Sequence, residues 1–174
     1  LAQAGLDAGA QVTLVTHPTG LTPPVGADVV EARTTQQMLD GVLTACENAD
    51  GLIMAAAVAD FRVKRVAEHK LKKQDGIPQI ELEAAPDVLG AVAKLRVDLK
   101  RLKVVVGFAA ESRDLVENAA AKLTSKKLDF IAANDISASD AGFAVETNRI
   151  TLLYVDGRRE SLPLMGKDEV AEAI

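Results

Sequence analysis

The chain has 174 residues, of which 48% are hydrophobic and 26% are charged, and its formal net charge is -5. This composition is that of one globular domain and excludes the disordered, collagen-like and coiled-coil classes. The acidic balance and an aromatic content of only 3% argue against a nucleic-acid-binding surface, which needs a broad basic face and stacking side chains.

Cys46 is the single cysteine, so it has no internal disulfide partner, and the sequence holds no Cys and His set with zinc spacing. No apolar run approaches the roughly 18 residues of a membrane span. The first residues lack the basic and apolar regions of a signal peptide. These features predict a cytoplasmic protein with no membrane or nucleic-acid partner, in which Cys46 is a small core residue.

Helical and strand patterns alternate along the first part of the chain. Continuous apolar, β-branched runs are typical of buried strands, and Thr or Asp before an apolar period of 3.6 marks a helix start. In chain order we predict a helix over residues 1–8 closed by Gly9, a strand over 11–17, a strand over 28–33, a helix from Thr34 or Thr35 to about Asn48 and a strand over 51–57.

The alternation resumes after residue 78 and sets the fold class. We predict a short strand over 79–83, a helix over 87–95, a strand over 103–111, a helix from Arg113 to about Lys127, a strand over 129–135, a hairpin over 149–163 and a helix from about Lys167. Apolar strands separated by helices predict an α/β fold with a doubly wound, mostly parallel, Rossmann-like sheet and helices on both faces. The hairpin closes one edge of this sheet or stands beside it.

The segment over about residues 61–78 follows no helical or strand period. Val63, Val66 and Leu71 are too sparse for a core stripe. Six cations lie in the segment, namely Arg62, Lys64, Arg65, Lys70, Lys72 and Lys73. The segment is either an ordinary solvated loop or a mobile flap that folds over bound phosphates and excludes water.

Small and polar residues end three of the predicted strands, as AAAVADF, GFAAES and AANDIS. Ligands of open α/β sheets bind outside the carboxyl ends of the strands, where small residues let the backbone approach a nucleotide. Asp60 at the first of these ends is a candidate contact for ribose, base or a phosphate-bound metal, or a simple turn residue. Lys122 and Lys126 share one helix face, either as a second cationic contact or as ordinary surface lysines.

These motifs occur in an order that closely resembles phosphopantothenoylcysteine synthetase. The resemblance rests on AAAVADF, HKLKK, APDVL, VVGFAAES, the lysine pair and AANDIS with a late Asn148, and it covers nearly the whole chain. It implies that CTP converts the carboxylate of 4'-phosphopantothenate into an acyl-cytidylate and that L-cysteine then displaces CMP to form an amide. Mg²⁺ accompanies the nucleotide, and no metal ligand is assigned among these residues.

The resemblance also implies roles for individual residues. Lys70 matches a flap lysine of the acyl-cytidylate step, and Ala57 lies in the motif associated with that intermediate. The positions that match nucleotide contacts are Met54, Ala55, Ala56, Asp60, Lys70, Pro86, Asp87, Val88, Leu89, Phe108, Lys122 and Lys126. A homodimer in which the partner completes each site is implied too, as is FMN in a fused decarboxylase domain outside this chain.

The family domain carries a glycine-rich turn and a loop with an Arg and an Asn near its start, and neither is present here. We therefore interpret residues 1–174 as a single CTP-binding synthetase domain without that segment and expect the natural chain to begin before Leu1. The activity of these residues alone is left open.

Two further functions stay open at this point. A dinucleotide-dependent oxidoreductase shares the sheet pattern, although the G-x-G-x-x-G sequence that marks it does not occur. A non-catalytic nucleotide-binding module that dimerises is the other, because the short strand over 79–83 offers an edge for pairing across a two-fold axis.

Overall fold

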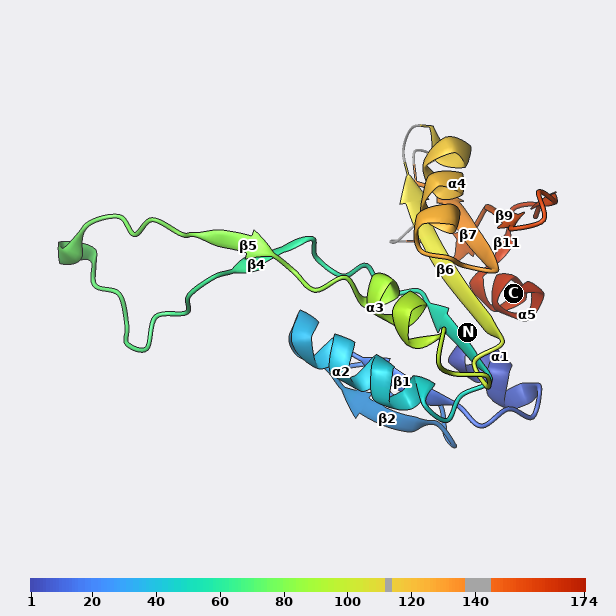
Figure 1. The fold of residues 1–174 in the computed structure, drawn as a ribbon, viewed down its shortest axis with the longest axis horizontal. Coiled ribbons are helices and arrows are strands. Elements are labelled where there is room, and N and C mark those ends of the chain that lie inside the picture. Colours follow the sequence, from blue (N-terminus) through green and yellow to red (C-terminus); the bar gives the residue numbers. More distant parts are fainter. Residues whose placement is uncertain (112–113, 137–144) are drawn as a thin grey trace.

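A five-stranded sheet forms the centre of the protein in the computed structural model, which describes residues 1–111, 114–136 and 145–174 (Figure 1). The strands run in the order β10-β9-β7-β6-β3, with β3 at Gly51–Met54, β6 at Val104–Glu111, β7 at Phe130–Asp135, β9 at Ile150–Tyr154 and β10 at Arg159–Ser161. β3, β6 and β7 pair in parallel, whereas β9 and β10 are antiparallel. The mainly parallel α/β fold predicted from the apolar strands is confirmed.

A second, separate pair of parallel strands lies beside this sheet, with β1 at Thr13–Thr16 and β2 at Asp28–Glu31. Val15 of β1 and Ala32 belong to the same hydrophobic core as Met54 of β3. In the part of the chain that the structure describes, however, no ladder joins β1 to β3. The single continuous sheet expected from the pattern is therefore divided in two, because strand pairing decides where a sheet is continuous and periodicity does not specify it.

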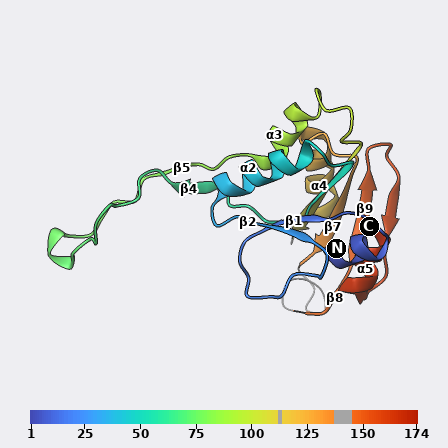
Figure 2. The same cartoon turned by 90° about the horizontal axis from the view of Figure 1, so that it is seen from below.

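Helices cover both faces of the central sheet, as a doubly wound fold requires. Successive residues of β7 point to opposite faces. Ile131 and Ala133 join the core that contains α2 (Thr35–Cys46), α3 (Val88–Leu95) and α4 (Leu115–Ser125). Ala132 joins a second cluster that contains Val170 of α5 (Lys167–Ala173), while α1 (Ala2–Asp7) contacts α5 (Figure 2).

The predicted hairpin is present and closes one edge of the sheet. β9 pairs with β7 on one side and with β10 on the other, and Gly157 in the turn has a φ of 88°. That left-handed conformation suits glycine. A short antiparallel pair of β8 (Thr147–Asn148) and β11 (Met165–Gly166) stands next to α5.

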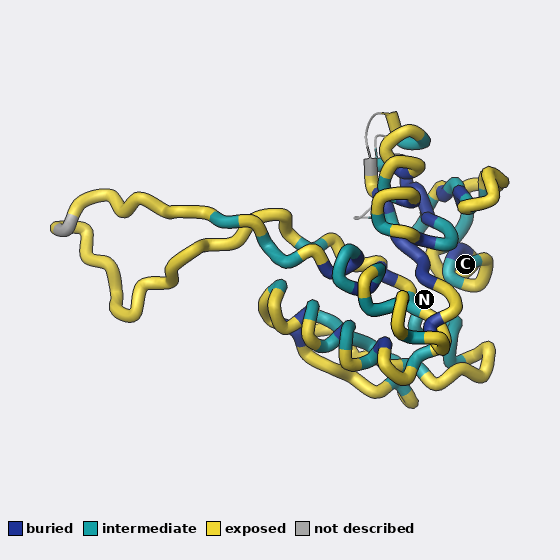
Figure 3. Tube along the Cα trace, viewed as in Figure 1, coloured by how far each residue is buried: buried dark blue, intermediate teal, exposed yellow. Residues whose placement is uncertain are grey.

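The basic segment, over about residues 61–78, forms most of a long arm. We define this arm as residues 61–84. Figures 1 and 2 show this arm projecting far from the body, and Figure 3 shows that it is almost entirely exposed. At its root, β4 (Phe61–Val63) and β5 (Leu82–Ala84) pair antiparallel, and a short 3-10 helix, η1 (Lys73–Asp75), lies farther out. The prediction of an irregular segment is wrong for β4, where pairing with β5 makes a strand without any local period, and for the three residues of η1. It is correct for the other residues between Val63 and Pro78.

The predicted starts of two helices are confirmed by their caps. Thr34 accepts a hydrogen bond from the backbone N–H of Gln37 at 3.1 Å, and Asp87 accepts one from that of Gly90 at 2.9 Å. The predicted helix start at Arg113 lies outside the described residues. In the part that is described, α4 begins at Leu115. None of the helices within residues 1–111, 114–136 and 145–174 has the length and apolar character needed to span a membrane.

Candidate functional site

The carboxyl end of β3 carries the small residues that match nucleotide contacts. Met54 is buried and pairs with Gly107, the residue of β6 that precedes Phe108, and the ladder between β3 and β6 ends at this pair. The next residues, Ala55, Ala56 and Ala57, are all exposed. Their methyl groups leave the backbone at the strand end accessible, which is what recognition of a nucleotide by main-chain groups needs.

Asp60 links this strand end to the start of α3. Its side chain is exposed, and its backbone oxygen accepts a hydrogen bond of 2.8 Å from the N–H of Ala85. Pro86 and Asp87 follow at once, so two segments that are separated by the whole arm lie next to each other. The contact follows from the pairing of β4 with β5 where the arm joins the body. The sequence did not indicate this pairing.

The first residues of α3 can offer a ligand their backbone more readily than their side chains. Val88 and Leu89 are buried in the main core, at 4% and 8% exposure. Only their main-chain groups are left for the predicted nucleotide contact. Asp87 is exposed and Pro86 is half-buried, so these two present side-chain surface at the same point.

Two lysines of α4 reach across to β6 and α3. Lys122 Nζ donates to the backbone oxygen of Phe108 at 2.6 Å, and Lys126 Nζ lies 2.5 Å from Asp87 Oδ2. The ring of Phe108 packs against the second cluster, beside Ala132. Hence the predicted positions Phe108, Lys122, Lys126 and Asp87 are brought together from three elements, with the backbone of Phe108 turned to the lysine.

The charges in this group favour an ionised Asp87. Partial burial opposes ionisation, but the hydrogen bonds from Lys126 and from the Gly90 N–H outweigh it, so the pKa of Asp87 lies below its usual value. Lys94 adds a smaller attraction. At neutral pH the site therefore contains a fixed carboxylate with a lysine held against it.

A cavity of about 800 Å³ opens at the carboxyl ends of β1, β2 and β3, under the root of the arm. Ala56 and Ala57 line it together with Val58 and Ala59. The other walls come from the ends of β1 and β2, the start of α2 and the arm residues Arg62, Val63, Lys64, Val66 and Glu83. The volume is in the range of small-molecule sites.

His17 and Arg33 line this cavity, and the sequence analysis missed both. His17 directly follows β1, and Arg33 comes two residues after the end of β2. That position was a usable signal, because the strand-end rule applies to these two strands as it does to β3. His17 faces the backbone oxygen of Pro18 at 2.9 Å, and Arg33 pairs with Glu31 at 3.1 Å.

The arm cations fall into two groups. Arg62 pairs with Glu83 at 2.8 Å and Lys64 with Glu81 at 3.4 Å, so both act across the β4–β5 ladder. Lys70 lies in the exposed outer segment and is not among the described residues that line the cavity. The structure therefore does not bring Lys70 to the other predicted positions of the same chain.

A family of known domains matches the entire sequence. The model of the DNA/pantothenate metabolism flavoprotein C-terminal domain covers residues 1–174. The chain belongs to this family. Its members and their structural relatives supply the comparison for the fold and for the site.

Three relatives show how far the likeness extends. The coenzyme A biosynthesis bifunctional protein CoaBC of Bacillus subtilis (strain 168) is 40% identical over 98% of this chain and 41% of its own length. The crystal structure of the C-terminal domain of a CoaBC protein superposes with a TM-score of 0.79 at 34% identity, covering 99% of this chain and 74% of that one. A Cab2 mutant in complex with phosphopantothenate-cysteine reaches a TM-score of 0.57 at 17% identity, over 79% and 47% of the two chains, and shares the fold.

The chain spans less than half the length of the curated relatives it matches, 41% in the Bacillus protein and 43% in that of Vibrio cholerae. Within its own length, the family domain corresponds to the α/β body and the arm together. The Rossmann-like architecture is thus common to this chain and its solved relatives.

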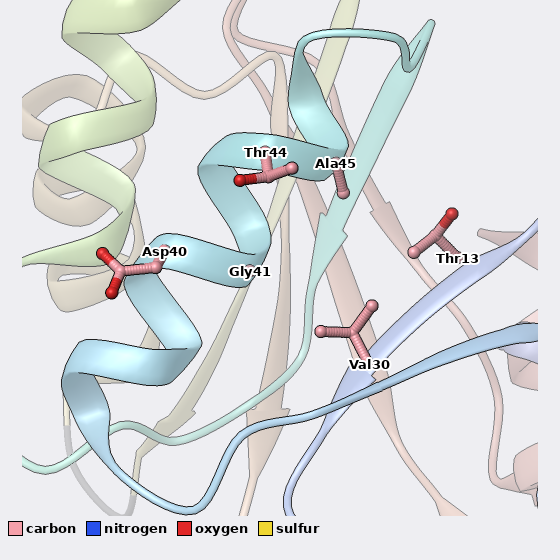
Figure 4. A pocket seen from close by; sticks show the side chains of 6 residues that line it. All are labelled: Thr13, Val30, Asp40, Gly41, Thr44 and Ala45. Atoms are coloured by element: carbon pink, nitrogen blue, oxygen red, sulfur yellow. The ribbon is translucent and has the colours of Figure 1, made fainter.

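Two other features do not form a candidate site. Among the described residues, no group of three or more His, Cys, Asp or Glu side chains is arranged to hold a metal ion. A smaller cavity of about 330 Å³ lies between α2 and the β1–β2 pair, where Figure 4 shows Asp40, Thr44 and Val30 around it. None of the residues predicted for the nucleotide lines this second cavity.

Proposed function

We propose that this domain is a phosphopantothenate–cysteine ligase of coenzyme A biosynthesis. Its substrates are CTP, 4'-phosphopantothenate and L-cysteine. The family membership and the CoaBC relatives support this assignment. The relative whose structure holds phosphopantothenate-cysteine supports the choice of product class through its shared fold.

The convergence around Asp87 is the observation that carries the proposal. Positions that are far apart in the chain, such as Asp87 and Lys126, meet at 2.5 Å, and Ala85, two residues before Asp87, is hydrogen-bonded to Asp60 in the segment that follows β3. The backbone at the end of β3 is available to a base and ribose. The ammonium groups of Lys122 and Lys126 are available to phosphates. An enzyme that activates a carboxylate with a nucleoside triphosphate needs both kinds of contact.

The chemistry divides into two displacements. A carboxylate oxygen of phosphopantothenate attacks the α-phosphorus of CTP, and the bond to pyrophosphate breaks. The amine of cysteine then attacks the acyl carbon, loses a proton, and CMP leaves with the electron pair. Lys122 and Lys126 stabilise the charge that develops on the phosphates, and the exposed end of β3 at Ala55, Ala56 and Ala57 holds the cytidine.

Mg²⁺ fits this site as a companion of the nucleotide. The exposed carboxylate of Asp60 is an oxygen donor of the kind Mg²⁺ prefers, and phosphates and water complete such a shell. The ion supplies charge neutralisation at the phosphates. We assign no residue of this chain to FMN. In our proposal, FMN binds to a separate decarboxylase domain that is fused to this one.

The arm supports a homodimer in which each chain completes the other's site. Exposed apolar side chains line it, namely Phe61, Val63, Val66, Leu71, Ile77, Ile80 and Leu82. A lone two-stranded ladder is marginally stable in water. Pairing with a second arm would cover these side chains, and an arm directed away from its own body would deliver Lys70 to the partner's nucleotide (Figure 1).

Calorimetry and a product assay test the function together. The domain is expected to bind CTP at least tenfold more tightly than ATP or GTP, by about 1.4 kcal/mol. Pyrophosphate release from CTP should require 4'-phosphopantothenate, and amide formation should require L-cysteine. Equal affinity for the three nucleotides would refute the assignment, and nicotinamide binding would favour the oxidoreductase instead.

A further inference from the structure

Asp87 uses its two carboxylate oxygens for two different elements. Oδ1 accepts the Gly90 N–H at 2.9 Å and caps α3, while Oδ2 takes the Lys126 ammonium at 2.5 Å. The absence of a side chain at Gly90 makes room for this carboxylate, because a Cβ there would collide with it. The carboxylate is thus oriented by its hydrogen bond to the helix that it caps.

Lys126 is the C-cap that follows the last residue of α4, four positions beyond Lys122. A lysine at a helix end has a long flexible stem, and fixing it costs conformational entropy. Here both ammonium groups are tied to other elements, Lys122 to the backbone of β6 and Lys126 to Asp87, the N-cap of α3. Lys126 is also the more enclosed partner of its pair, since its side chain is 30% exposed and that of Asp87 is 53% exposed.

We propose that Asp87 is a positioning residue that holds Lys126 ready for the phosphates of the ligand. An ammonium group has three N–H donors. The contact with Asp87 occupies one of them, so the lysine can keep this contact and donate to a phosphate at the same time. The choice of a nucleotide as ligand rests on the proposed function, whereas the positioning of the lysine rests on the contacts above.

Two effects of removing the charge at Asp87 oppose each other. The loss of a carboxylate near the phosphates favours an anionic ligand through simple Coulomb attraction, but it also releases Lys126. Salt screens the first effect between exposed groups and leaves the second. The two are therefore separated by measurement at raised ionic strength, about 0.3 M, where the Debye length is shorter than at physiological salt.

Titrations with CTP and with inorganic triphosphate test the proposal on four proteins: the unchanged chain, Asp87→Asn, Lys126→Met and the double variant. Asn keeps the cap on α3 and lacks the charge. At about 0.3 M salt, Asp87→Asn is expected to weaken both ligands about threefold to tenfold. In the Lys126→Met background the same change should have no effect, because no ammonium group is left to position.

A matched control and a ligand-free readout complete the design. Asp50→Asn removes one charge at the opposite end of β3, where Asp50 pairs with Arg101, and should leave both affinities unchanged. Proton NMR of the lysine ammonium groups should show that exchange at Lys126 becomes faster in Asp87→Asn and stays the same at Lys122.

The outcomes separate this inference from the proposed function. Affinity that is equal or higher in Asp87→Asn, or an equal loss with and without Lys126, overturns the positioning role. If CTP binds no better than ATP or GTP while triphosphate still shows the Asp87 and Lys126 coupling, the ligase assignment fails and the positioning role stands.

Discussion

Arg96 and Asp129 clamp the amino ends of β6 and β7 to the end of α3. The guanidinium lies 2.8 Å from Asp129 Oδ2, and it also donates to the backbone oxygens of Leu102 at 3.1 Å, Lys127 at 3.4 Å and Lys103. Asp129 Oδ2 accepts the Val105 N–H at 2.7 Å. A single side chain thus joins a helix to the start of two parallel strands.

Arg96→Lys should lower the free energy of unfolding by about 2 kcal/mol, because lysine keeps the charge but lacks the planar fork that reaches several acceptors. Urea denaturation measures the change. The control is Arg101→Lys at the exposed pair with Asp50, where the expected loss is below about 0.5 kcal/mol. Equal losses at the two positions would contradict the role of the fork.

The stability that Asp87 confers should depend on pH. Its folded pKa is lowered, since the hydrogen bonds from Lys126 and Gly90 outweigh the opposing effect of burial. Its contribution is therefore complete above the unfolded value of 3.8 and disappears as the pH falls through the folded pKa. The difference in unfolding free energy between the unchanged chain and Asp87→Asn should shrink below about pH 4. A difference that stays constant down to about pH 2 would rule this out.

The arm should be dispensable for folding and required for assembly. Replacing residues 65–80 with Asn-Gly joins Lys64 to Glu81, whose backbones are already hydrogen-bonded at 2.9 Å, through a two-residue hairpin turn. We expect the free energy of unfolding of the body to change by less than about 0.5 kcal/mol. Light scattering should show a dimer for the unchanged chain and a monomer for the shortened one. A monomer in both cases would exclude the proposed dimer.

Lys70 should act on the partner's nucleotide. Lys70→Ala is expected to bind CTP but to lose turnover, and Lys126→Met to lose CTP affinity. In a mixed dimer of the two variants, action across the dimer puts both defects in one site and leaves the other intact, so activity returns. Action within one chain leaves a defect in each site, so no activity returns. The assay requires a ligase-active form of the chain, and coexpression supplies the mixed dimers.

Cys46 should resist thiol reagents in the folded protein. It lies on α2 in the main hydrophobic core and is 1% exposed, and this burial raises the pKa of its thiol. Ellman's reagent is expected to label it only after denaturation in urea. Rapid labelling of the native chain would show that α2 opens locally.

Local patterns in the sequence determined most of the strands and helices of the body and where several of them begin. Thr34 and Asp87 cap their helices as predicted, because an Asx or Thr side chain satisfies the first free N–H groups without help from distant residues. The turn at Gly157 follows from local chemistry in the same way. The resemblance added the set of site positions, and Asp87, Phe108, Lys122 and Lys126 from that set do lie together.

Contacts between distant segments were decided only in the tertiary structure. Pairing between β4 and β5 creates a strand where no period exists, and the gap between β1 and β3 divides the sheet. The hydrogen bond of Ala85 with Asp60 and the ion pair of Lys126 with Asp87 each join residues that are far apart in the chain. Sequence periodicity reports which face of an element is apolar, but the partner that covers this face is chosen by the packing of the whole chain.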